Sequence, residues 1–158
     1  MKLLRLTAML ACALLAASCS SLPGWMGGGA SISRVTIVSE PGANGNVAIG
    51  VDLVMTSDPD VAAAIMKLNA NDWFIPKSGD PLAARDRFLR DYPDGIVIWH
   101  RELASGQVLR DEPVDSPSGM ILAVVFALYG SEGDHRLRLG DASSVRLTLD
   151  SDDVRLSQ

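Results

Sequence analysis

The stretch from Val47 to Met55, VAIGVDLVM, decides the fold because its apolar side chains recur at every second position. Successive side chains of a β-strand point to opposite faces, so this period predicts a strand with one buried face. The residues between them, Gly50, Asp52 and Thr56, are expected on the open face.

Similar patterns lie on both sides of this stretch. Residues 34–38 alternate around Val35 and Ile37 and predict an edge-like strand, while 145–149 alternate around Leu147. Residues 120–129 are apolar at nearly every position, which is typical of a central strand covered on both faces. Further strands are predicted at 96–103, 107–109 and 135–139. Residues 154–156 either extend the 145–149 strand or form a short last one.

Between these strands, residues 58–93 predict two helices. Asp58-Pro59 and Asp80-Pro81 each supply an N-cap and a proline for the first turn, and Asn69 can end the first helix. Arg85, Arg87 and Arg90 are expected to face water, or else to form a docking patch for an acidic partner. The chain therefore predicts an all-β or α+β fold, an antiparallel β-sandwich with a two-helix insertion at 58–93 in one domain, residues 32–158. A layered α+β fold is the alternative.

The N-terminus has the features of an export signal. Lys2 and Arg5 precede a mostly apolar segment, residues 6–17, of the length typical of a secretory signal and too short for a membrane span of roughly 20 residues. Leu15-Ala-Ala-Ser-Cys19 resembles a bacterial lipobox. That resemblance implies a signal peptide at 1–18, cleavage between Ser18 and Cys19, and acylation of Cys19. Cys12 fits less well because bulky Met9 and Leu10 precede it.

Acyl chains on Cys19 would hold the protein to a membrane, since each buried methylene contributes about 0.8 kcal/mol. Residues 19–31 predict a flexible tether because Gly24 and Gly27 to Gly29 offer little side chain to pack. Trp25 and Met26 have three possible contacts: the membrane, the domain or a partner. No aspartate follows Cys19, which in lipoproteins suggests the outer membrane, on its periplasmic face.

Composition excludes several functions. Loss of Lys2 and Arg5 with the signal leaves 12 basic and 19 acidic residues, a formal charge of −7. Such an acidic chain is a poor nucleic-acid ligand, because that affinity comes mainly from cations meeting phosphates. Cys12 and Cys19 are the only cysteines. The mature domain therefore has no disulfide, no cysteine nucleophile and no cysteine metal site.

No catalytic pattern is evident. The sequence contains neither a Gly-x-Ser-x-Gly elbow nor a phosphate-binding Gly-Lys-Ser/Thr loop. His100 is expected to be a half-exposed strand residue with a cross-strand contact rather than a general base, and His135 to lie in a solvated turn. Asp150, Asp152 and Asp153 form an acidic cluster, but calcium takes six or more oxygens arranged around it, and three aspartates near the C-terminus offer at best a weak site. We therefore predict a protein that is not an enzyme and has no cofactor or metal.

The loop from Glu40 to Asn46 is longer than the two residues that suffice for a tight hairpin. Glu40, Asn44 and Asn46 offer one charge and two amides, and loops on rigid sheets often carry binding function. We interpret these three side chains as a candidate partner-binding surface. An ordinary exposed loop is the alternative.

The order of these features resembles the type VI secretion system outer-membrane lipoproteins, the TssJ family. It runs from a lipidated cysteine and tether to a loop with Asn44-Gly45, a helical stretch with Trp73-Phe74, a turn at Ser105-Gly106-Gln107 and an apolar strand at 121–127. The resemblance implies a transthyretin-like β-sandwich. It also implies a partner, the periplasmic domain of an inner-membrane secretion component, bound through the loop between the first strands. We expect a non-enzymatic assembly or docking component of an envelope secretion apparatus. The alternative is a periplasm-facing lipoprotein binding module, either an inhibitor or a small-ligand carrier.

Overall fold

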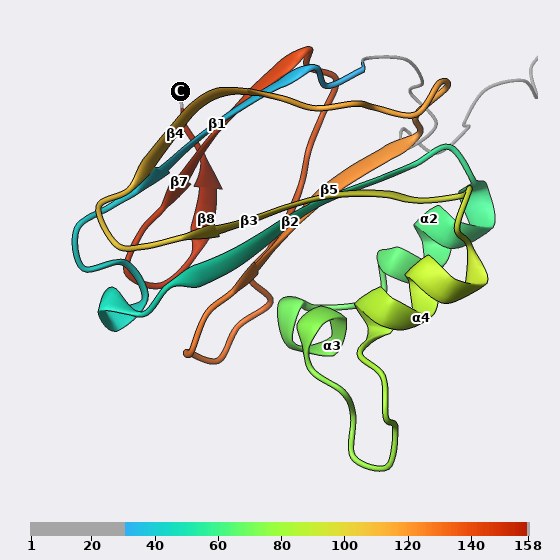
Figure 1. The fold of residues 1–158 in the computed structure, drawn as a ribbon, viewed down its shortest axis with the longest axis horizontal. Helices are drawn as coiled ribbons and strands as arrows, with labels where there is room; N and C mark the ends of the chain where they lie inside the picture. The colour runs from blue at the N-terminus through green and yellow to red at the C-terminus, as the bar shows by residue number, and fades with distance from the viewer. Residues whose placement is uncertain (1–30, 158) are drawn as a thin grey trace, which may run out of the picture.

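The computed structural model describes residues 31–157 and shows two four-stranded sheets stacked face to face (Figure 1). The strand order is β4-β1-β7-β8 in sheet 1 and β3-β2-β5-β6 in sheet 2. The predicted sandwich, mostly β with an α-helical part, is confirmed. The strands are β1 (Arg34–Ser39), β2 (Ile49–Thr56), β3 (Val97–Leu103), β4 (Val108–Pro113), β5 (Leu122–Leu128), β6 (Arg136–Arg138), β7 (Ser144–Leu149) and β8 (Val154–Leu156).

Strand β2 follows the predicted alternation on its inner face only. Val51, Leu53 and Met55 are buried between the sheets. The prediction that Asp52 and Thr56 face the open side is wrong, because helices cover that face and both residues are fully buried. Thr56 compensates by donating its hydroxyl to the Gly95 carbonyl at 2.6 Å. Val47 lies outside the strand and is 64% exposed.

β1 and β5 each have a neighbouring strand on both sides, but the sequence predicted this only for β5. β1 is not an edge strand, since it pairs with β4 antiparallel and with β7 parallel. Its alternation indicated one buried face but carried no information about how many strands flank it. β5 is central as predicted, lying between β2 and β6. Its Val125 packs between the sheets while Val124 packs under the helices.

Three short helices, rather than two, cover the outer face of sheet 2: α2 (Pro59–Ile65), α3 (Ala70–Phe74) and α4 (Ala84–Asp91). Asp58 caps α2 as predicted, accepting from the N–H groups of Asp60 and Val61. Asn69 begins α3 instead of ending α2, because its side chain accepts from Asp72 N–H. The Asp80 carboxylate closes a turn onto Leu82 N–H, so α4 starts only at Ala84.

β4 is longer than predicted, and the structure settles the two possibilities left open for residues 154–156. β4 continues to Pro113, whereas the predicted strand ended at residue 109. Residues 154–156 form a separate strand, β8, antiparallel to β7. No helix among residues 31–157 is long and apolar enough to cross a membrane. The predicted signal peptide, Ser18, Cys19, Trp25 and Met26 lie outside the described residues.

Candidate functional site

The strand directions gather four connections at one end of the sandwich, which we call the loop end: residues 40–48, 104–107, 129–135 and 150–153. Residue 31, where the described chain starts, lies at the opposite end with 114–121 and 139–143 (Figure 1). There Ser33 bonds Ser143 and Val114, and Ser116 bonds the Ile32 carbonyl. The predicted partner-binding loop therefore lies at the end remote from residue 31.

Backbone conformation gives the loop 40–48 a defined shape. Gly42, Asn44, Gly45 and Asn46 have positive φ angles of 88°, 49°, 61° and 68°. Glycine and asparagine are the residues that adopt this left-handed region most readily. A 3-10 turn, η1 (Ala43–Asn46), results, with Ala43 buried beneath it.

Hydrogen bonds join this loop to its neighbours at the loop end. Gly42 N–H donates to Ser105 Oγ at 2.7 Å, and Gly106 N–H to the Glu40 carbonyl at 3.3 Å. The Asn44 side chain accepts from Gly130 N–H at 2.8 Å. Asn44 is thus a brace between two loops, whereas Glu40 and Asn46 have exposed side chains.

An open hollow of about 490 Å³ lies beside the loop. Sequence reasoning missed Val47, which lines it with a largely exposed apolar side chain. No signal in the sequence could separate Val47 from the buried residues, because it continues the alternation of Ile49 and Val51 in phase. The lining residues are Asn44, Gly45, Val47, Ala48, Leu128, Tyr129, Gly130, Ser131, Ser151 and Asp152.

His135 lies beneath this end and is only 4% exposed, so the prediction of a solvated turn is wrong. Its ring packs on Tyr129 at 4.8 Å between centroids. Its Nδ1 lies 3.3 Å from Asp153 Oδ1 and its Nε2 lies 3.0 Å from the Ser131 carbonyl. The imidazole therefore links loop 129–135 to loop 150–153. Gly133 makes room for it, since a Cβ there would come within 2.6 Å of the ring.

The three aspartates at 150–153 stabilise a turn. Asp150 Oδ1 accepts from the N–H groups of Asp152 and Asp153, both at 2.9 Å, and Oδ2 pairs with Arg155. Burial opposes the charge on Asp150, but these N–H groups and Arg155 outweigh it and lower its pKa. Burial, followed by the nearby charges of Asp150 and Asp153, raises the pKa of Tyr129, whose hydroxyl donates to the Asp153 carbonyl. Within residues 31–157 no group of three or more side chains is arranged to hold a metal ion.

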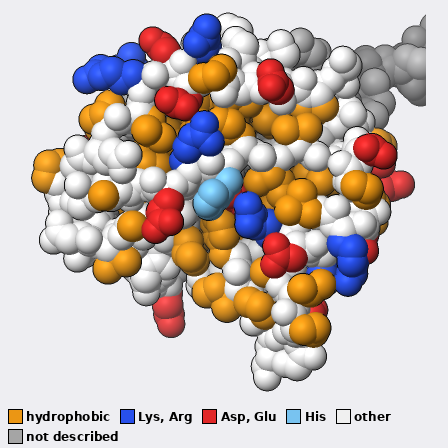
Figure 2. All heavy atoms as spheres, viewed as in Figure 1, with side chains coloured by type: hydrophobic (Ala, Val, Ile, Leu, Met, Phe, Trp, Pro, Cys, Tyr) orange, Lys and Arg blue, Asp and Glu red, His pale blue; other side chains and the backbone are white. Residues whose placement is uncertain are grey.

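A second polar cluster surrounds the buried Asp52 of β2. Its carboxylate accepts from Trp73 Nε1 of α3 at 2.9 Å and lies 2.5 Å from His100 Nδ1 of β3. Arg85 Nε of α4 lies 2.8 Å from it without the alignment of a hydrogen bond, which makes this contact mainly one of charge. We call these four residues the Asp52 latch. Figure 2 shows a histidine among charged side chains of both signs on this face.

The structure tests the predictions made for His100 and for the three arginines of α4. His100 makes the expected cross-strand contact and its side chain is 45% exposed. No hydroxyl or thiol within residues 31–157 is hydrogen-bonded to its ring, whose hydrogen-bond partner is Asp52 on the neighbouring strand β2. Arg85 does not simply face water, because it reaches Asp52. Arg87 pairs with Asp80 and Arg90 with Asp91, whose carboxyl pKa is lowered by that bond.

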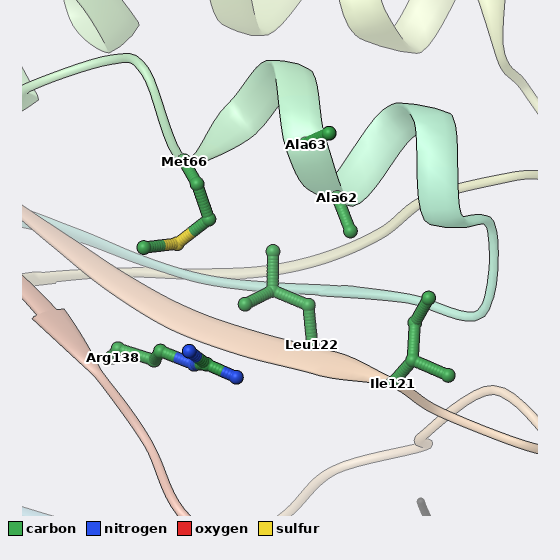
Figure 3. A pocket seen from close by; sticks show the side chains of 6 residues that line it. All are labelled: Ala62, Ala63, Met66, Ile121, Leu122 and Arg138. Carbon is green, nitrogen blue, oxygen red and sulfur yellow. The ribbon is translucent and has the colours of Figure 1, made fainter. Parts of the chain in front are cut away.

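An apolar hollow of about 260 Å³ opens between α2 and the start of β5. Ala62 and Met66 face Ile121 and Leu122 across it, with Arg138 to one side (Figure 3). Its volume lies below the roughly 300–1,000 Å³ of typical small-molecule sites. It gives little support to the small-ligand carrier alternative.

Neither a protein-family model nor a curated protein sequence matches this chain. Solved structures do. A protein of a type VI membrane complex has a TM-score of 0.56 and 16% identity over 81% of this chain and 100% of its own. Serratia marcescens Lip, described as a membrane bound component of the type VI secretion system, has a TM-score of 0.51 and 11% identity over 81% and 98%. The type VI lipoprotein TssJ1 of Pseudomonas aeruginosa has a TM-score of 0.49 and 16% identity over 80% and 96%.

The first two likenesses define the class of fold. This chain has the β-sandwich of type VI membrane-complex proteins, and it spans nearly their whole length. The resemblance noted in the sequence is thus confirmed at the level of the fold.

Proposed function

We propose that this chain is a lipid-anchored, non-enzymatic docking component of an envelope secretion apparatus of the type VI kind. Its fold is that of proteins described as parts of such membrane complexes. The proposed location is the periplasmic face of the outer membrane, with the anchor on Cys19.

The position of the loop end is the observation that carries this proposal. Residues 19–31 span at most about 45 Å when extended, since each residue covers up to about 3.6 Å. They join the sandwich at residue 31, opposite the loop end. Attachment at that end leaves loop 40–48 on the far side of the domain, where a periplasmic partner can reach it.

Three exposed side chains of that loop, Glu40, Asn46 and Val47, are proposed to contact the partner, the periplasmic domain of an inner-membrane secretion component. The braced backbone presents them in one arrangement, which lowers the entropy lost on binding. Asn44 supports this surface from beneath by its bond to Gly130.

The anchor is tested by Cys19→Ser. We expect the variant to move from the membrane fraction to the soluble periplasmic fraction with an unchanged thermal midpoint. Sedimentation with membranes after a high-salt wash would contradict acyl anchoring.

The docking surface is tested by combining Glu40→Ala, Asn46→Ala and Val47→Ser. Capture of the purified periplasmic domain should fall about tenfold or more, as is common when interface anchors are removed, with little change in thermal midpoint. A control at another exposed site replaces Ile75 and Lys77, near the helices, by serine and alanine. Equal capture by the loop variant and the control would place the interface elsewhere.

A further inference from the structure

The basic side chains of the domain divide into two groups. Seven of the twelve lysines and arginines described have a carboxylate within 4.0 Å: Lys77, Arg85, Arg87, Arg90, Arg101, Arg136 and Arg155. The other five, Arg34, Lys67, Arg110, Arg138 and Arg146, have none within residues 31–157, although the chain is acidic overall. Two of these five, Arg34 and Arg146, lie on β1 and β7, adjacent strands of sheet 1.

Strand register brings these two arginines to one hollow. In the parallel β1–β7 pair, Arg34 lies opposite Ser144 and Thr36 lies opposite Arg146. Val35 and Val145 between them are buried in the core, so their flanking neighbours point outward. The hollow on this outer face measures about 230 Å³. It is lined by Arg34, Thr36, Asp111, Ser144, Val145, Arg146 and Ser157.

An irregularity in β4 positions Arg34. The β1–β4 register shifts between Val35 and Ile37, and Asp111 opposite adopts a positive φ of 49°. Its N–H donates to Thr36 Oγ1 at 3.1 Å and its carbonyl accepts from Arg34 Nη1 at 3.0 Å. Such bulges commonly re-aim a side chain, and a strained residue persists where its surroundings hold it. One N–H of the guanidinium is thereby fixed, and its other donors have no hydrogen-bond partner among residues 31–157.

The chemistry of this hollow suits an oxyanion. Two guanidinium groups offer forked N–H donors that match phosphate geometry, and the exposed Ser144 hydroxyl adds a further donor. The Asp111 carboxylate, which forms no ion pair within 4.0 Å in the described part of the chain, opposes the anion and limits its affinity. We propose that Arg34, Arg146 and Ser144 form a binding site for a phosphate group.

The phosphate group has two possible sources, a lipid headgroup or a soluble phosphate ester. Arg34 and Ser144 lie at the starts of their strands, at the same end as residue 31. With the proposed anchor at Cys19, the tether joins the domain at the end where the hollow lies and keeps it within reach of the membrane surface, which favours a headgroup. The phosphate site itself does not depend on the proposed docking function.

The test is titration of the mature chain, carrying Cys19→Ser, with inorganic phosphate at constant ionic strength. Backbone amide signals of Ser144 and Ser157 report occupancy by NMR. We expect saturable shifts at these residues. The double variant Arg34→Gln/Arg146→Gln should weaken binding about tenfold or more, because charge-assisted bonds are lost. Asp111→Asn should tighten binding severalfold. The double variant Lys67→Gln/Arg138→Gln removes the same two positive charges outside the hollow, so it is the matched control for net charge and should change nothing.

Vesicles of phosphatidylcholine with and without phosphatidylglycerol identify the source. Binding that needs phosphatidylglycerol and both arginines assigns the site to a headgroup, while phosphate binding without vesicle binding assigns it to a soluble ester. Two results would overturn the proposal: no saturable shift at Ser144 and Ser157, or equal losses in Arg34→Gln/Arg146→Gln and in Lys67→Gln/Arg138→Gln. Thermal midpoints of all variants exclude unfolding as the cause.

Discussion

The two faces of sheet 2 are both buried, yet they are held by different forces. The inner face packs against sheet 1 through aliphatic side chains such as Val51, Leu53 and Val125. The outer face adds to its apolar contacts the Asp52 latch, which ties α3 and α4 to β2. Apolar burial is non-directional and fixes how much surface is covered, whereas a buried carboxylate demands particular partners. The difference teaches that burial of apolar surface holds the two sheets together, whereas directed bonds to Asp52 fix the positions of the helices.

The aromatic stack beside the latch supports this reading. Trp73 lies on Phe126 with ring centroids 4.9 Å apart and 9° between planes, and its Nε1 reaches Asp52. One side chain thus supplies both apolar area and a directed bond. Other positions of α3 would leave Asp52 buried with fewer partners, which costs several kcal/mol.

The largest expected effect is on the inner face. Leu53→Ala removes a fully buried side chain between the sheets and should lower the free energy of unfolding by about 2–5 kcal/mol. The loss should affect the whole domain, because both sheets share this core. Chemical denaturation followed by circular dichroism measures it. A loss confined to the helices would break the comparison.

The next effect is on the outer face. Asp52→Asn keeps the shape but removes the charge facing Arg85, and should cost about 1–3 kcal/mol because Arg85 is partly exposed and can turn to water. Amide hydrogen exchange should accelerate in α3 and α4 while amides of β1 and β7 stay protected. Glu102→Gln, an exposed carboxylate on β3, is the control. Uniform acceleration in both sheets would show that the latch is not local.

A smaller effect is expected at the loop end, because the interaction removed there is one side-chain hydrogen bond and not a packed sheet face. Asn44→Ala removes the bond to Gly130 N–H and imposes a positive φ on alanine, which should cost about 1–2 kcal/mol. Asn44→Gly keeps the conformation and loses only the bond, so it should cost less. Thermal unfolding compares the two variants, and equal costs would exclude a backbone contribution.

The smallest effect concerns pH. The folded state lowers the pKa of Asp150 below 3.8, so its stabilising contribution is present above that pH and is lost as the pH falls through the lowered value. Asp150→Asn should therefore lower the thermal midpoint at about pH 6 and have less effect at about pH 3. An equal decrease at both values would mean that the charge of Asp150 does not contribute.

Much of the sandwich was predictable because alternating apolar and polar residues indicate, within a few positions, which face of a strand is buried. The period of two at 49–55 and 145–149 and the uninterrupted apolar run of β5 identified strands correctly. Asp58 as an N-cap was predictable for the same reason, since its partners are within three residues. The prediction that Asn69 ends the first helix was wrong, because an asparagine between two helices can equally cap the start of the second.

The candidate site was predictable only in part. The length of loop 40–46 pointed to the loop end, and Asn44 was predicted to contact a partner, but its bond to Gly130, 86 residues away, was not predictable. His135 follows Asp134 in a turn-like sequence, yet its ring is buried against Tyr129 and Asp153. Contacts between distant segments of this kind leave no local pattern.

The sequence by itself determined which segments are strands, which face of β2 is apolar and where α2 begins, since these depend on side chains a few residues apart. Only the tertiary structure decided the neighbours of β1, the burial of Asp52 under α3 and α4, and the placement of Arg34 and Arg146 beside one hollow. The physical reason is that each of these depends on two surfaces far apart in the chain: a polar residue on a strand is stable either in water or beneath a partner, and its own neighbours in sequence do not distinguish the two.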